Sequence, residues 1–168
     1  MPKRLQLLHE LIPNAAAFGV LVEDLQMAAR ALGLQLVVMN ARTDSDLETA
    51  FATLSQQRVG AVLVSPNGYY NTIMKQLVAL AARHALPAII SDREFALAGG
   101  LMSYGVNLDY VWHQVGIYVG RILKGEKPAN LPVEQAVKIE LTLNLKTAKA
   151  LRLTIPETLL ATADEVIQ

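Results

Sequence analysis

The sequence predicts an α/β fold: a doubly wound, Rossmann-like parallel sheet with a C-terminal strand-helix appendage. Two observations predict it. Up to residue 124, apolar runs of strand length alternate with runs of helical period, which is typical of a parallel sheet with helices on both faces. After residue 128 this alternation stops. The pattern therefore divides the chain into a Rossmann-like lobe over residues 1–128 and a second segment over residues 129–168.

Five apolar runs are expected to form the strands of the lobe, because each has strand length and is bounded by turn residues or by a helical pattern. The first of them indicates a strand that is buried. The expected strands cover residues 17–22, 34–39, 59–65, 87–91 and 101–104.

Between these runs, apolar residues recur with the period of an amphipathic helix. Ser45 and Glu48 have the spacing of a capping box, which predicts the start of the third helix. Gly33 is suited to end the second helix, and Gly99-Gly100 predicts a tight turn that requires positive φ after one helical turn at 95–98. The helices of the lobe, apart from that single turn, are expected at residues 5–12, 24–32, 47–54, 73–84 and 109–123.

Beyond Pro128 the period changes. From Val133 to Leu143, apolar residues alternate with polar or charged ones, which predicts a half-buried strand. Short helices are expected at residues 145–151 and after Pro156.

Length and composition limit the classes of function. A chain of 168 residues is long enough for one domain with a continuous core. Fifteen basic residues balance fifteen acidic ones, so net charge gives no basis for binding nucleic acid or an anionic membrane surface. The absence of cysteine excludes disulfides, thiolate metal sites and cysteine nucleophiles.

The candidate site is a set of polar and aromatic residues at the carboxyl ends of the expected strands, where open α/β sheets bind their ligands. Three tyrosines could stack on a planar ligand, and charged or amide side chains could hold an amino or carboxylate group. The plain alternative for each is a solvent-facing loop side chain, or a tyrosine that fills the core. The candidate ligand-binding residues are Asn67, Tyr69, Tyr70, Asp92, Arg93, Glu94, Tyr104 and Asn107.

No pattern indicates catalysis. The three histidines lie on separate elements without metal-ligand spacing, and no nucleophile elbow, P-loop or dinucleotide-binding glycine motif follows a strand. Arg93 between Asp92 and Glu94 would keep both carboxylates ionised, which suits binding. Trp112, near the start of the long helix, is interpreted as a packing residue. We therefore expect a protein that is not an enzyme and needs no cofactor.

Several stretches carry a family resemblance and follow one another in order: REF at 93–95, AGGLMSYG at 98–105, GRILKGEKP at 120–128, LPVEQ at 131–135, NLKTAKAL at 144–151 and ADEVI at 163–167. The series resembles the ABC-transporter substrate-binding protein family with the type I periplasmic-binding fold, whose better-known branch takes up aromatic amino acids. The resemblance covers nearly the whole chain.

This resemblance implies a non-catalytic, bilobed protein that closes on a small solute, such as an amino acid, and delivers it to an ABC permease. Family members are periplasmic or lipid-anchored. The chain corresponds to the second lobe, which makes it a truncated form; as written it carries no export signal and would be cytoplasmic. The loop after Val22 is also about ten residues shorter than the family pattern.

The resemblance further implies that residues 129–168 would pack on the absent first lobe. The strand from Val133 to Leu143 would then have lost its partners. We expect it to join either this lobe's own sheet or a second copy of the chain, which would give a homodimer.

Two other classes share the fold pattern. One is the effector-sensing domain of a transcription regulator, but the sequence contains no helix-turn-helix pattern. The other is a flavodoxin-like or receiver-like domain, for which Glu23-Asp24 is suggestive. A receiver needs a phosphate-accepting aspartate at the end of its third strand, where this sequence has Ser65-Pro66.

Overall fold

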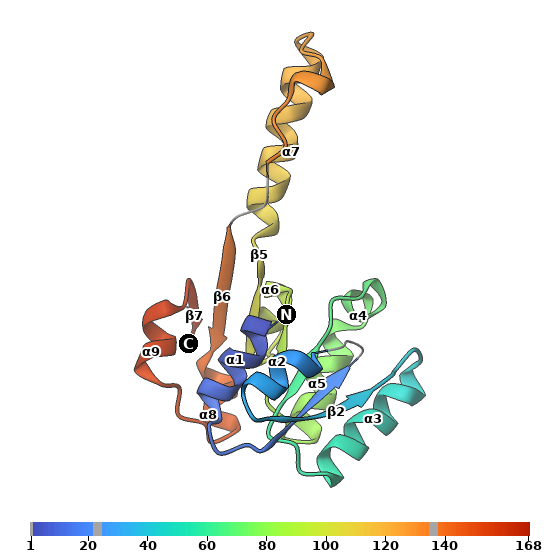
Figure 1. The fold of residues 1–168 in the computed structure, drawn as a ribbon, viewed down its shortest axis with the longest axis vertical. Helices are drawn as coiled ribbons and strands as arrows, with labels where there is room; N and C mark the ends of the chain where they lie inside the picture. The colour runs from blue at the N-terminus through green and yellow to red at the C-terminus, as the bar shows by residue number, and fades with distance from the viewer. Residues whose placement is uncertain (1, 22–24, 135–137) are drawn as a thin grey trace.

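A sheet of seven strands, in the order β2-β1-β3-β4-β5-β6-β7, forms the centre of the computed structural model (Figure 1). The structure describes residues 2–21, 25–134 and 138–168. β1 to β5 run parallel to one another, which confirms the predicted doubly wound sheet, and β6 runs antiparallel to β5. The strands are β1 (Ala17–Leu21), β2 (Gln35–Met39), β3 (Val62–Val64), β4 (Ala88–Ile90), β5 (Met102–Val106), β6 (Ile139–Asn144) and β7 (Glu165–Ile167).

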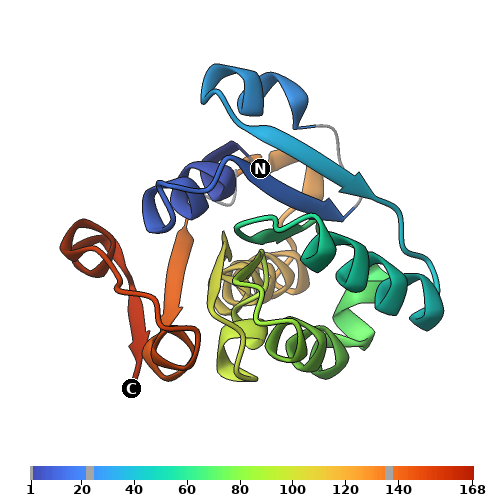
Figure 2. The same ribbon diagram turned by 90° about the horizontal axis from the view of Figure 1, so that it is seen from below.

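The helices cover both faces of the sheet and create two apolar cores (Figures 1 and 2). α1, α2, α8 and α9 bury their apolar residues against one face, and α3, α4, α5 and α6 against the other. In Figure 2, α1 (dark blue) lies on one side of the sheet, with α3 (teal) and α5 (green) on the other. The helices are α1 (Pro2–Leu11), α2 (Gln26–Ala31), α3 (Asp44–Gln56), α4 (Gly68–Thr72), α5 (Met74–Arg83), α6 (Arg93–Leu97), α7 (Leu108–Leu123), α8 (Leu145–Ala150) and α9 (Glu157–Thr162), with a 3-10 turn at Pro128–Asn130.

The start of α3 corrects the predicted capping box. Thr43, not Ser45, is the N-cap: its hydroxyl accepts a hydrogen bond from the Asp46 amide at 3.2 Å, and the Asp46 carboxylate accepts one from the Thr43 amide at 3.0 Å. The two sequence patterns differ by two residues, and the earlier one is the cap because Thr43 itself has extended backbone angles and α3 begins at Asp44. The predicted apolar face, with Leu47 and Phe51, is buried as expected.

α7 differs from the other helices, because none of its sixteen residues is buried. It begins directly after β5 and runs away from the body of the molecule (Figure 1). The chain returns alongside it before entering β6.

The C-terminal segment packs on this lobe's own sheet. β6 pairs with β5 on one side and with β7 on the other, and Leu143 and Leu159 are buried in the same core as α1. The sequence analysis expected the Val133–Leu143 strand to join either this lobe's own sheet or a second copy. The structure shows its described part in the lobe's own sheet. β6 begins at Ile139, residues 135–137 lie outside the described part, and β7 pairs with Thr142 to Asn144 of β6.

Within the described ranges, none of the helices combines the length and apolar character needed to cross a membrane.

Candidate functional site

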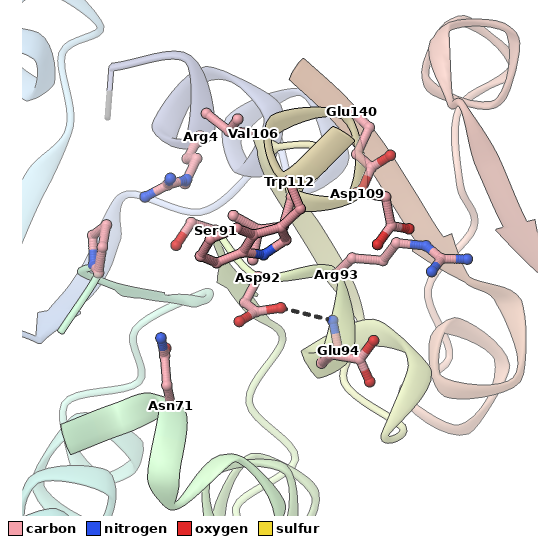
Figure 3. Close-up of a pocket in the computed structure, with 12 residues that line it drawn as sticks. Arg4, Asn71, Ser91, Asp92, Arg93, Glu94, Val106, Asp109, Trp112 and Glu140 are labelled. Carbon is pink, nitrogen blue, oxygen red and sulfur yellow. Dashed lines mark hydrogen bonds between the residues drawn. The ribbon is translucent and has the colours of Figure 1, made fainter. Parts of the chain in front are cut away.

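A cleft of about 520 Å³ lies at the carboxyl ends of the parallel strands β3, β4 and β5 (Figure 3). The loops after these strands contribute Pro66, Ser91 and Asp92 to its lining, and the base of α7 contributes Trp112. Open α/β sheets bind their ligands at this edge, in the crevice outside the carboxyl ends of the strands.

The β4 and β5 strands approach each other closely beneath the cleft. Gly105 lies on β5, and a Cβ atom at this position would overlap the backbone carbonyl oxygen of Ser91. Only glycine therefore allows the Ser91–Asp92 loop to lie where it does. Asp92 is the N-cap of α6, because its Oδ1 accepts a hydrogen bond from the Glu94 amide at 3.0 Å.

Three of the eight candidate residues line the cleft: Asp92, Arg93 and Glu94. The Arg93 guanidinium makes a two-point ion pair with Glu165 of β7, with N–O distances of 2.6 and 2.9 Å. This pair lowers the pKa of the Glu165 carboxyl below its usual value and raises that of Arg93. The sequence analysis expected Arg93 to keep Asp92 and Glu94 ionised, whereas the structure pairs its guanidinium with a carboxylate 72 positions away.

The tyrosines at 69 and 70 lie outside this cleft and pack on α3 and the loop before it. The Tyr70 side chain is buried, and its hydroxyl donates to the Ala41 carbonyl at 2.9 Å. The Tyr69 hydroxyl donates to Asp44 at 2.7 Å, which raises the pKa of Tyr69 to about 12. Asn67 caps α4 by accepting the Tyr69 amide at 2.9 Å.

The remaining two candidates also have structural contacts instead of a place in the lining. The Tyr104 carbonyl accepts a hydrogen bond from Nε of Arg4 at 2.7 Å, and its half-buried ring packs on the core. Asn107 caps α7 by accepting the Tyr110 amide at 2.7 Å, and its side-chain nitrogen donates to Glu140 at 2.6 Å. Asn107 therefore fixes the start of α7 next to the cleft.

The cleft also contains residues that the sequence did not single out. Trp112, interpreted as a packing residue, is 67% exposed and stands above Asp92 (Figure 3). Arg4 reaches the cleft from α1, at the other end of the sequence, so no local pattern could have indicated it. The further additions are Asn71, Ser91, Val106, Leu108, Asp109 and Glu140.

The lining combines an aromatic surface with an excess of acidic groups. Asp92, Glu94, Asp109 and Glu140 face the cleft against Arg4 and Arg93, and Arg93 is already paired with Glu165. Such a lining suits a ligand that carries a protonated amine and a planar or apolar body. Among the described residues, no three His, Cys, Asp or Glu side chains form a group that could hold a metal ion.

Comparisons with known proteins agree with this geometry. Residues 3–167 match the family model described as ABC transporter substrate binding protein. A conserved domain protein from Vibrio cholerae has the same fold, with a TM-score of 0.84 and 23% identity over 98% of this chain and 59% of its own. An ABC domain from Streptococcus pneumoniae in complex with L-Trp has a TM-score of 0.84 and 22% identity over 99% of this chain and 60% of its own.

A third structure is that of CD0873 from Clostridium difficile, a substrate binding protein with adhesive properties in a ligand-free, open form. It has a TM-score of 0.70 and 20% identity over 98% of this chain and 58% of its own. The chain thus spans about three-fifths of the length of these structures. A search of the curated proteins gave no match. Because the family model matches almost the whole sequence, the chain belongs to the ABC transporter substrate-binding protein family, whose members bind a substrate without converting it.

Proposed function

We propose that this chain captures a small solute, such as an amino acid, for an ABC import system and binds it in the cleft between β3, β4, β5 and α7. The observation that carries the proposal is the arrangement of Asp92, Ser91 and Trp112 around one cleft at the carboxyl edge of the sheet. An amine would bind the carboxylate, and an aromatic or apolar side chain would contact the indole.

The partners follow from this proposal. The solute would be delivered to an ABC permease, and the protein would act in the periplasm or on a lipid anchor, as the family does. The chain spans about three-fifths of the length of the solved structures, and we propose that the described cleft supplies one wall of the binding site. Binding by one wall should be weak, with a Kd on the order of 1 mM.

Isothermal titration calorimetry with L-tryptophan and other L-amino acids tests the proposal. Asp92→Asn keeps a side chain that can cap α6 but removes the negative charge, so we expect at least about tenfold weaker binding of amine-bearing solutes. Asp44→Asn makes the same chemical change outside the cleft and should leave affinity unchanged. Equal affinity of Asp92→Asn and the parent chain would contradict the proposed site.

A further inference from the structure

Two sequence stretches far apart in the chain, REF at 93–95 and ADEVI at 163–167, meet beside the cleft. The Arg93 guanidinium donates two hydrogen bonds to the Glu165 carboxylate, from Nε at 2.6 Å and from Nη2 at 2.9 Å. Two parallel hydrogen bonds fix the direction of a guanidinium, so this contact determines where the charge of Arg93 lies. Figure 3 shows the Arg93 guanidinium and the Asp92 carboxylate pointing to opposite sides.

Both partners of this ion pair are fastened to the same strand, β6. On one side, the buried Asn144 of β6 donates a side-chain hydrogen bond to the Ala96 carbonyl of α6 at 2.9 Å. On the other side, the Asp164 carboxylate, next to β7, accepts the Leu141 amide of β6 at 2.8 Å. Because α6 and β7 are both held by β6, the two charged side chains meet at a fixed place in the fold.

Other carboxylates lie within electrostatic reach of the same guanidinium. Glu94 follows Arg93 on α6, Glu140 lies on β6, and all three residues line the cleft. The hydrogen bond with Glu165 is the largest cause of the raised pKa of Arg93, and the charges of Glu140 and Glu94 raise that pKa further. If Glu165 did not hold it, the guanidinium would be free to turn to either of these carboxylates.

We propose that Glu165 is a positioning residue of the cleft: by holding the Arg93 guanidinium beside β7, it keeps the cleft carboxylates available to a cationic group of the solute. The inference rests on the proposed function, because it concerns the same cleft. It also names the preferred class of solute at this wall. A protonated amine with an aromatic body should bind better than a carboxylate with the same body.

The charge of the cleft depends on where the Arg93 charge lies. Four carboxylates line the cleft, those of Asp92, Glu94, Asp109 and Glu140. A wall with an excess of negative charge attracts a cation and repels an anion. A guanidinium that turned into the cleft would cancel part of this excess and would occupy the oxygens that an amine needs. The position of Arg93 therefore determines the charge preference of the cleft.

Tryptamine and indolepropionate are suitable probes, because they share the indole ring and carry opposite charges at the end of a short side chain. Trp112 lines the cleft and is the one tryptophan among the 168 residues, so its indole N–H signal in nuclear magnetic resonance spectra reports binding at this site. Titrations of the full chain followed by this signal give a Kd for each probe. The parent chain should bind tryptamine at least about tenfold more tightly than indolepropionate.

The substitution Glu165→Gln tests the role of Glu165, because it keeps the size of the side chain and removes its charge. We expect it to weaken the binding of tryptamine about fivefold and to strengthen the binding of indolepropionate by a similar factor. A purely structural role would weaken the binding of both probes alike. The opposite changes for the two probes are therefore the result that supports the proposal.

A matched control removes the same charge elsewhere. Glu48 also pairs with an arginine, Arg83, at 2.9 Å, and both residues lie outside the cleft lining. Glu48→Gln should therefore leave the affinity for both probes unchanged. A change of charge preference in Glu48→Gln as large as that in Glu165→Gln would overturn the proposal, because the effect would then come from net charge alone.

A second background shows whether Glu165 acts through Arg93. In Arg93→Gln the guanidinium is absent, so adding Glu165→Gln should change the affinity for tryptamine by less than about twofold. A loss of about fivefold in this background, as large as that in the parent, would overturn the proposal. Glu165 would then attract the solute directly.

The remaining outcomes separate this inference from the proposed function. If the parent chain prefers tryptamine and Glu165→Gln keeps the same preference, the positioning role is wrong and the solute-binding cleft stands. A parallel loss of both affinities in Glu165→Gln would also overturn the positioning role. If neither probe shifts the Trp112 signal of the parent chain, the proposed function of the cleft is contradicted, and this inference with it.

Discussion

Gly105 allows β4 and β5 to approach closely beneath the cleft, so even its replacement by alanine should lower the stability of the fold. In Gly105→Ala the new methyl group would meet the Ser91 carbonyl, which belongs to the backbone and cannot rotate away. We expect the free energy of unfolding to fall by roughly 2–3 kcal/mol. Gly116→Ala adds the same atom in open space within a helix and should instead raise stability by about 0.5–1 kcal/mol. Urea unfolding followed by circular dichroism measures both changes.

The Arg93–Glu165 pair should make stability depend on pH. The pair lowers the pKa of Glu165, so its contribution is present above the ordinary carboxyl pKa near 4.5 and is lost as pH falls through the lower, folded-state value. Both side chains are about one-third exposed, which limits the contribution to about 1 kcal/mol at most. Glu165→Gln should therefore be less stable than the parent chain at pH 7. The difference should shrink towards pH 3.

A matched substitution separates this pair from ordinary surface charges. Glu48→Gln removes the partner of Arg83, but these two side chains are 47% and 60% exposed. We therefore expect Glu48→Gln to lower the free energy of unfolding at pH 7 by less than Glu165→Gln does. If Glu48→Gln lowers the free energy of unfolding at pH 7 as much as Glu165→Gln does, the Arg93–Glu165 pair stabilises the fold no more than an exposed surface ion pair.

Single residues also show which positions around the cleft a local sequence pattern can locate. Asp92, Arg93 and Glu94 could be placed in the cleft because a strand end and its loop are readable from local pattern. Arg4 could not, because it reaches the cleft through packing of α1 on a distant part of the sheet. Tyr69 and Tyr70 were placed at the correct end of a strand, yet their side chains turn towards α3. Local pattern does not determine that direction.

At the scale of elements, α3 offers a direct test of its observed start. Thr43→Ala removes the hydroxyl that accepts the Asp46 amide and should lower the free energy of unfolding by about 1 kcal/mol. Ser45→Ala, at the position that the sequence pattern favoured, should change it by less than about 0.5 kcal/mol. Thermal unfolding compares the two variants. A larger loss of stability in Ser45→Ala than in Thr43→Ala would instead identify Ser45 as the N-cap.

The same scale shows why most elements were predictable and a few were not. The parallel strands lie within apolar runs of strand length, and α3, α5 and α7 repeat their apolar residues over enough positions for a helical period to be clear. β7 is three residues long and half-buried, so it carries no period of its own. It forms because Thr142 to Asn144 of β6 offer it a pairing edge. The exposure of α7 was equally invisible, since an apolar period does not say what will cover it.

At the scale of the whole molecule, we propose that the chain folds as one unit, because β6 pairs directly with β5 of the parallel sheet. A division after residue 128 would make the last forty residues an appendage, whereas the structure buries Leu141, Leu143 and Leu159 among residues of α1 and β1. Thr158 also donates a hydrogen bond to Glu10 at 2.6 Å, which joins the two ends of the chain. The sheet is therefore complete only when β7, close to the C-terminal end of the sequence, has paired with β6.

This arrangement predicts that the C-terminal segment is required for folding. A chain that ends at Leu131 would lose the buried residues of β6, α8 and α9 and leave β5 as an open apolar edge, so it should show no cooperative unfolding transition. In the full chain, Leu143→Ala should lower the free energy of unfolding by about 2–5 kcal/mol because Leu143 is fully buried. Leu123→Ala, at 83% exposed, removes the same atoms from the tip of α7 and should have almost no effect. Urea titration of the three variants beside the full chain decides the matter: a cooperative transition in the shortened chain, close to that of the full one, would mean that residues 1–131 fold independently and that the segment after them is an appendage.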